Sequence, residues 1–164
     1  LDEAVALALA TDRAPLIFSD AGDNPGGGGS GRTTELLRAL VEAGAEGVLY
    51  GSIFEPGLAA AAHESGIGAM INARFNAETG TVFDVPFEAP AEVLALGDGA
   101  VTGRLGLYAG RRLQLGPTAV CARAEMTSSA FSICWRSACS AFSLRWTLWS
   151  STFSGRSAWC RCIC

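Results

Sequence analysis

A short run of acidic, amide and glycine residues near the N-terminus offers the densest chemistry in the chain. It spans residues 19–31 and reads SDAGDNPGGGGSG. Backbone N–H groups of glycines can approach a bound anion closely, and a helix that begins just after them adds partial positive charge. Asp20, Asp23 and Asn24 could instead bind a hard cation or orient a water nucleophile. The same composition is also typical of a flexible turn, because Asx side chains bond nearby backbone.

A nucleotide site is the second interpretation of this run. Gly26, Gly28 and Gly31 match the spacing G-x-G-x-x-G, which allows close approach of a pyrophosphate. Against this, Asp20 and Asp23 would repel phosphate, and the chain has no lysine to complete a Walker A loop. The match is weak, and a nucleotide- or anion-binding module that uses Gly26–Gly31 is kept as an alternative.

The histidine and the cysteines do not form a recognisable metal motif. His63-Glu64 begins like H-E-x-x-H, but Ile67 stands where the second histidine is needed. We expect His63 to contact the terminal carbonyls of its own helix. Cys160, Cys162 and Cys164 alternate and lack the paired C-x-x-C spacing of zinc modules. We therefore expect no metal site built from the histidine or the cysteines.

The elements around the glycine run are predicted from hydrophobic spacing. Residues 1–12 favour a helix, and Leu16-Ile17-Phe18 is typical of a strand buried on both faces. After the loop, Thr33 or Thr34 is expected to cap a helix that Gly44 ends. The apolar stripe of that helix is Leu36, Leu37, Leu40 and Val41.

A second strand and helix follow at residues 47–50 and 56–63, and a third strand is expected from Ile67. This alternation predicts an α/β fold with a short parallel βαβ-type sheet, whose loops at the carboxyl ends of the strands would hold a ligand. From Thr81 the spacing predicts a β-rich meander, with a hairpin at Gly97-Asp98-Gly99 between Leu96 and Val101.

Composition divides the chain near residue 125. Residues 1–125 carry 8 arginines and 16 acids, whereas residues 126–164 carry 4 arginines, no acid, 5 of the 6 cysteines and all 4 tryptophans. Arginine without lysine is typical of a GC-rich gene, and such a gene read in a wrong frame yields this tail's residue types. We therefore expect an incomplete α/β domain at 1–125 and an irregular tail at 126–164 that is not a native domain.

Charge and hydropathy exclude several classes of function. The acidic front part has no basic face for phosphates, which argues against nucleic-acid binding. No run of about 18 apolar residues is present and the N-terminus does not resemble a signal peptide, so we expect no membrane partner and a cytoplasmic location.

The front part closely resembles the C-terminal domain of the microcystinase C (MlrC) family over about residues 15–120. The likeness is carried by residues 19–63, by ARFNAETG at 73–80 and by GPTAV at 116–120, and DNPGGG is its most specific motif. The resemblance implies a two-domain α/β metallohydrolase that uses zinc to cleave linear peptides derived from microcystin. Its metal ligands belong to an N-terminal domain that is missing here, so zinc is expected in the full-length family and none in this chain.

The resemblance also implies which residues bind substrate. These are the loop positions Asp23, Asn24, Pro25, Gly26, Gly27 and Gly28, which would line the cleft and help to hold a peptide substrate or its oxyanion; no catalytic residue is expected. Arg32 departs from the family, where an aspartate commonly precedes the Thr-Thr pair, at a cost of about 0.3–1 kcal/mol in helix-dipole energy. The expected function is a fragment of a zinc metallopeptidase, inactive without its N-terminal metal-binding domain. A non-catalytic interaction fragment, whose tryptophans bury against a partner, is the third hypothesis.

Overall fold

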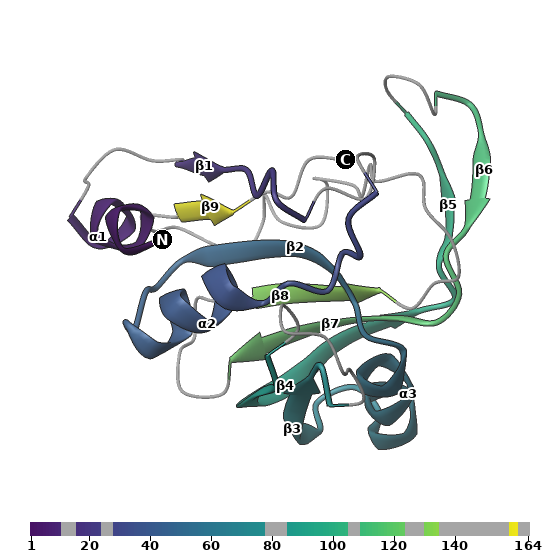
Figure 1. The fold of residues 1–164 in the computed structure, drawn as a ribbon. Coiled ribbons are helices and arrows are strands. Elements are labelled where there is room, and N and C mark those ends of the chain that lie inside the picture. Colours follow the sequence, from purple (N-terminus) through teal and green to yellow (C-terminus); the bar gives the residue numbers. More distant parts are fainter. Residues whose placement is uncertain are drawn as a thin grey trace.

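The computed structural model describes residues 1–10, 16–23, 28–77, 85–104, 109–123, 130–134 and 158–160 (Figure 1). Its elements, in chain order, are α1 (Asp2–Ala10), β1 (Ile17–Phe18), α2 (Glu35–Glu42), β2 (Val48–Phe54), α3 (Pro56–Ser65), β3 (Met70–Phe75), β4 (Phe87–Gly97), β5 (Ala100–Thr102), β6 (Arg112–Gln114), β7 (Thr118–Arg123), β8 (Ala130–Cys134) and β9 (Ala158–Cys160).

The main sheet is mixed. Its strand order is β1-β9-β2-β8-β7-β4-β3, and the first four strands are parallel to one another, whereas β8, β7, β4 and β3 alternate in direction. The predicted α/β class is confirmed, and β1 and β2 belong to its parallel part. The expected third parallel strand is wrong, because β3 pairs antiparallel with β4, from Met70 opposite Glu92 to Phe75 opposite Phe87.

The predicted hairpin at Gly97–Gly99 is also wrong. Residues 87–97 form a single strand, β4, while β5 leaves the main sheet and pairs with β6 in a separate two-stranded sheet. The turn itself redirects the chain, because the Asp98 side chain accepts a hydrogen bond from the backbone of Ala100 and Gly99 has a φ of 72°. The backbone N–H of Leu115 then donates to the carbonyl of Gly99, which ties the base of the β5–β6 arm together.

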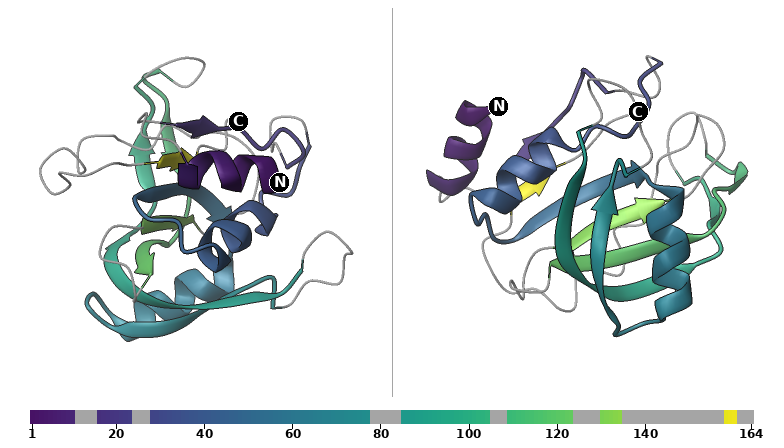
Figure 2. Two further views of the ribbon diagram at one scale, coloured as in Figure 1. Left: turned by 90° about the vertical axis from the view of Figure 1, so that its left-hand side faces the viewer. Right: turned by 60° about the horizontal axis from the view of Figure 1, so that its bottom comes forward.

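The core lies between the main sheet and helices α2 and α3. Figure 2 shows α3 lying across the sheet and α1 beside α2 at the end nearer β1. The predicted stripe of α2 is confirmed for its three leucines, which are buried, and Val41 packs partly against them. The largest fully buried side chains are those of Tyr50, Ile53, Phe75, Asn76, Val93 and Cys121.

Two local predictions fail at the ends of β1 and α2. β1 forms one edge of the sheet and Ile17 is 62% exposed, so this strand is not buried on both faces. Thr34 stands at the N-cap position of α2 but its side chain makes no capping hydrogen bond. Its hydroxyl accepts a hydrogen bond from Asn76 instead. Gly44 ends α2 with a φ of 67°, as predicted.

Two segments of the expected irregular tail are strands. β8 lies between β2 and β7, and β9 lies between β1 and β2. The origin of residues 126–164 in a shifted reading frame stays a prediction. Within the described part of the chain, no helix is both long enough and apolar enough to cross a bilayer.

Cys121 on β7 gives the first testable prediction. Its side chain is fully buried, and this burial raises the pKa of the thiol to about 11 from its ordinary value of 9.0. We expect Cys121 to resist alkylation at pH 8 in the folded protein and to react after unfolding, as measured by peptide mapping. Rapid labelling of Cys121 in native buffer would contradict this.

The same group predicts the sign of a pH effect. Below about pH 9 the thiol is protonated in both folded and unfolded chains. Between about pH 9 and 11 the unfolded chain loses this proton first, so the Cys121 contribution to the free energy of unfolding falls as pH rises. A Cys121→Ser variant should lack this part of the pH dependence in urea titrations.

Candidate functional site

The glycine loop joins the end of β1 to the start of α2, and its last residues, Gly31 and Thr33, contact the carboxyl half of β2. The backbone N–H of Phe54 donates to the carbonyl of Gly31 at 2.9 Å, and the hydroxyl of Tyr50 donates to the carbonyl of Thr33 at 3.2 Å. Tyr50 is buried. These contacts hold the end of the loop at the edge of the sheet where the sequence pattern predicts a ligand.

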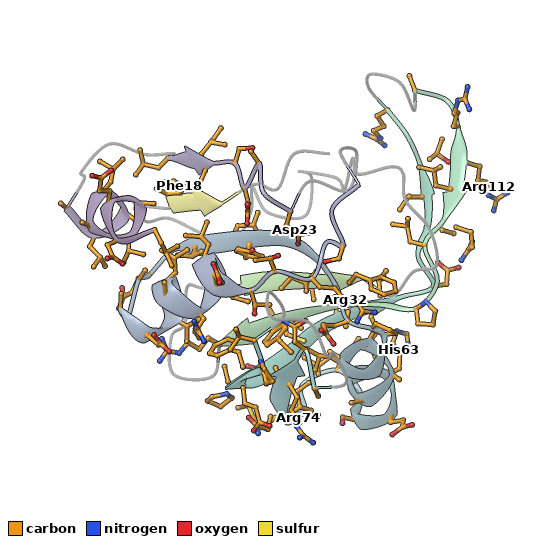
Figure 3. All side chains as sticks on the ribbon, viewed as in Figure 1. Phe18, Asp23, Arg32, His63, Arg74 and Arg112 are labelled. Carbon is orange, nitrogen blue, oxygen red and sulfur yellow. The ribbon has the colours of Figure 1, made fainter. Side chains whose placement is uncertain are left out.

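Asp23 organises this loop from within. Its side chain is 8% exposed, and Figure 3 shows it turned toward the loop and β2. Oδ1 accepts hydrogen bonds from the backbone N–H of Gly31 at 2.8 Å and from the hydroxyl of Ser30 at 3.3 Å, and Oδ2 accepts from the N–H of Thr33 at 2.7 Å. One carboxylate therefore links the two ends of the loop, since Asp23 and Thr33 are ten positions apart in the sequence.

The arrangement bears directly on the anion-site interpretation. The N–H groups of Gly31 and Thr33, which would hold a phosphate, bind the carboxylate of Asp23 instead. Asp20 has a similar local role, because its Oδ1 accepts hydrogen bonds from the N–H of Gly22 at 3.0 Å and of Asp23 at 3.3 Å. Both aspartates thus form turns, which is the structural role that the composition of the loop also allowed.

The structure describes two of the six predicted substrate-binding positions, Asp23 and Gly28. Gly28 is exposed with a φ of 95°, and a Cβ atom added there would meet nothing within 4 Å. Asn24, Pro25, Gly26 and Gly27 lie outside the described residues. Substrate binding by these six positions stays a prediction.

Arg32 has a partner that its position in the sequence does not reveal. Its guanidinium carbon lies 4.7 Å from the centre of the Phe54 ring, a cation–π contact at the end of β2. An Arg32→Asp variant loses this contact, worth about 0.5–1 kcal/mol, and gains a helix-dipole interaction of similar size. We expect a change of less than about 0.5 kcal/mol in the free energy of unfolding by urea titration; a loss above about 2 kcal/mol would show that Arg32 is essential to the loop.

Two further residues of the site, Glu55 and Asn76, are not among the positions predicted from the sequence. Glu55 follows β2 directly and is 8% exposed, and its Oε1 accepts a 2.7 Å hydrogen bond from the backbone N–H of Asn76 at the end of β3. In the sheet order β3 lies four positions from β2. Figure 2 shows β3 and β4 crossing the direction of β2 and β8, and this curvature lets the two strand ends meet. No local spacing in the sequence signals such a contact.

His63 does not contact the carbonyls of its own helix, so that expectation is wrong. Its Nε2 lies 3.0 Å from the carbonyl oxygen of Thr118 at the start of β7. The reason is that α3 packs against β7, which brings a strand carbonyl within reach of the imidazole.

The described residues do not fit a zinc site. Among them no group of three or more histidine, cysteine, aspartate and glutamate side chains is placed to hold a metal ion. The two buried carboxylates, Asp23 and Glu55, already accept backbone N–H groups, and His63 lies on the exposed side of α3. These side chains therefore serve the loop and the sheet, and we assign none of them to a metal.

Comparisons with known proteins identify the family of the chain. A family model described as the MlrC C-terminus matches residues 18–130, which include the glycine loop, Glu55 and Asn76. The chain belongs to the MlrC C-terminus family. The resemblance inferred from the sequence is thereby confirmed, and the match extends from β1 to the first residue of β8.

Two similar proteins place this MlrC C-terminus in context. Microcystinase C from Sphingomonas sp is 30% identical over 94 residues, which cover 57% of this chain and 18% of that protein. A crystal structure from Mesorhizobium sp. BNC1, named "Putative metallopeptidase", superposes with a TM-score of 0.64 at 22% identity over 84% of this chain and 27% of that one. The second likeness supports the fold. The chain spans less than a third of the length of either protein.

Proposed function

We propose that this chain supplies the C-terminal part of an MlrC-type metallohydrolase that cleaves peptide or amide bonds, and that its glycine loop lines the substrate site. Membership of the MlrC C-terminus family supports the reaction class, as do the names of the two similar proteins. The observation that carries the site is the closure of the loop by Asp23 at the carboxyl end of β2.

The chain's own residues would act by fixing the two ends of the glycine run before substrate binds. Asp23 joins the start of the glycine run to Gly31 and Thr33, and Tyr50 and Phe54 join the end of the run to β2. Residues that are held in place before binding lose less conformational entropy when a peptide docks on them. The proposed contribution of this domain is therefore substrate binding and orientation.

The metal would be held elsewhere in the enzyme. Since the described residues do not fit a zinc site, we assign zinc to an N-terminal metal-binding domain, the proposed partner of this chain. The domain alone is then expected to have no hydrolase activity.

Nucleotide binding by Gly26–Gly31 is less well supported. The N–H groups of Gly31 and Thr33 already donate to the carboxylate of Asp23. A phosphate that took over these two amides would lie close to the negative charge of Asp23 and be repelled by it. A titration with NAD or ATP is expected to leave the melting temperature of the chain unchanged. A saturable rise would favour the nucleotide module instead.

Complementation tests the proposed hydrolase. The chain is mixed with the separately expressed metal-bearing N-terminal region of microcystinase C, and hydrolysis of a linear peptide is followed by mass spectrometry. We expect hydrolysis only when both parts and zinc are present, and less of it with Asp23→Ala. An equal rate without this chain would contradict the proposal.

A further inference from the structure

Asn76 has an unusual backbone conformation for its position. Its φ is 55°, and it is the one non-glycine residue with a positive φ in the part of the chain that the structure describes. The side chain is also 1% exposed. Asparagine tolerates this left-handed region better than most residues, but a buried, strained residue persists only where its surroundings hold it.

The contacts of Asn76 explain what holds it. Its Nδ2 donates to the carbonyl of Arg32 at 3.1 Å, to the hydroxyl of Thr34 at 3.3 Å and to the carbonyl of Val85 at 3.4 Å. Its backbone N–H donates to Glu55. One residue thus connects the end of β3, the junction of β2 with α3, and the junction of the glycine loop with α2.

These hydrogen bonds hold the same short segment that Asp23 also holds. Thr33 donates its N–H to Asp23, while its neighbours Arg32 and Thr34 accept from Asn76. The segment where the loop becomes a helix is therefore held both by a carboxylate in the loop and by a carboxamide at the end of a distant strand.

The junction concentrates several features that a purely structural turn does not need. Thr34 gives up the capping hydrogen bond that its position in front of α2 offers. Asn76 adopts a strained φ, and Glu55 is a buried carboxylate. Departures of this kind, when they gather at one place, mark sites whose geometry serves function.

We propose that Asn76 is a positioning residue of the glycine-loop site, anchored by Glu55, which sets where the loop stands relative to the curved sheet. The functional part of this inference rests on the proposed role of the loop in binding substrate. The structural part, that Asn76 holds the end of the loop in place, does not depend on substrate binding. It can be tested by the hydrogen-exchange rates of the loop's backbone amides.

Hydrogen exchange of the full chain tests the structural part. Asn76→Asp keeps the size of the side chain and its tolerance of a positive φ but replaces the donor by an acceptor. Asn76→Gly keeps the backbone conformation and removes the side chain. In both variants we expect the N–H groups of Gly31, Thr33 and Phe54 to exchange at least about tenfold faster, while those of the β4–β7 ladder are unchanged.

Two controls separate this role from general stability. Asn72→Asp makes the same chemical change on β3, where Asn72 contacts Glu88 through an exposed hydrogen bond, and should leave the loop rates unchanged. Glu55→Gln retains an oxygen that can accept from Asn76 and should keep the loop rates within about twofold, whereas Glu55→Ala should raise them like the Asn76 variants.

Either of two exchange results would overturn the proposal. The first is an unchanged loop in Asn76→Asp and Asn76→Gly, and the second is an equal acceleration of the β4–β7 ladder. In the complementation assay, Asn76→Asp should raise KM more than it lowers kcat; an unaltered KM there would overturn the functional part. If the wild-type mixture does not hydrolyse the peptide, the proposed function fails and the exchange data still decide the role of Asn76.

Discussion

Asp23→Ala is expected to lower the free energy of unfolding by about 3 kcal/mol and to release the glycine loop. The substitution removes an acceptor that binds the N–H groups of Gly31 and Thr33 and the hydroxyl of Ser30. Hydrogen bonds to charged groups contribute about 1.5–3 kcal/mol each, and their loss is offset in part by water that reaches the freed amides. Urea titration of the full chain measures the change.

Two variants sharpen this test. Asp23→Asn keeps one acceptor oxygen, so it can bind Gly31 or Thr33 but not both, and we expect roughly half the loss. Asp98→Asn is the matched control, because Asp98 is exposed and its side chain accepts from Ala100, only two residues away. It should cost less than about 0.5 kcal/mol. Equal stabilities of Asp23→Ala and Asp98→Asn would show that Asp23 does not hold the loop.

Gly99→Ala is expected to be the most destabilising single change proposed, at about 3 kcal/mol or more. Gly99 has a φ of 72°, and a Cβ atom there would overlap the carbonyl oxygen of Gly116 and lie 2.7 Å from its nitrogen. Neither backbone can move away freely, because Leu115 donates to the carbonyl of Gly99. The melting temperature of the variant measures the effect.

Gly110→Ala provides the control for backbone strain alone. Gly110 has a φ of 74°, and an added Cβ would meet nothing within 4 Å. Its cost should be only the conformational penalty of about 1–2 kcal/mol. If the two variants were equally stable, the close approach of Gly99 to Gly116 would not be a constraint on the base of the β5–β6 arm.

Local interactions are the part of this fold that a single sequence predicts well. The stripe of α2, its end at Gly44 and the start of α3 at Pro56 all follow from helical spacing and terminal residues. The position of β2 follows from its apolar residues in the same way, although the strand extends to Phe54. Helix periodicity and end signals are short-range properties, so a single sequence contains them.

Strand pairing could not be predicted in the same way. The alternation of helices and strands suggests that β3 continues a parallel sheet, but β3 pairs with β4. The expected turn at Gly97–Gly99 does follow β4, but β4 pairs with β7 and β5 pairs with β6, so the two flanking strands do not form a hairpin. Pairing depends on which distant strands share a hydrophobic face, and one strand's own residues do not specify its neighbour.

The candidate site is predictable in outline but not in detail. The glycine run and the position of Asp23 are visible in the sequence, and a turn role for the aspartate is one of the interpretations that its surroundings allow. The pairing of Glu55 with Asn76 is not visible, although Asn76 lies in the ARFNAETG motif. The two residues are 21 positions apart and meet only because the sheet curves.

The strand order has a consequence for synthesis of the protein on the ribosome. β9 separates β1 from β2, and its register pairs Ile17 with Trp159. The N-terminal strand must therefore wait for nearly the whole chain to emerge before it can join the sheet through this neighbour. During that interval the facing edges of β1 and β2 expose backbone groups to other nascent chains, so expression at low temperature or with chaperones should reduce misassembly.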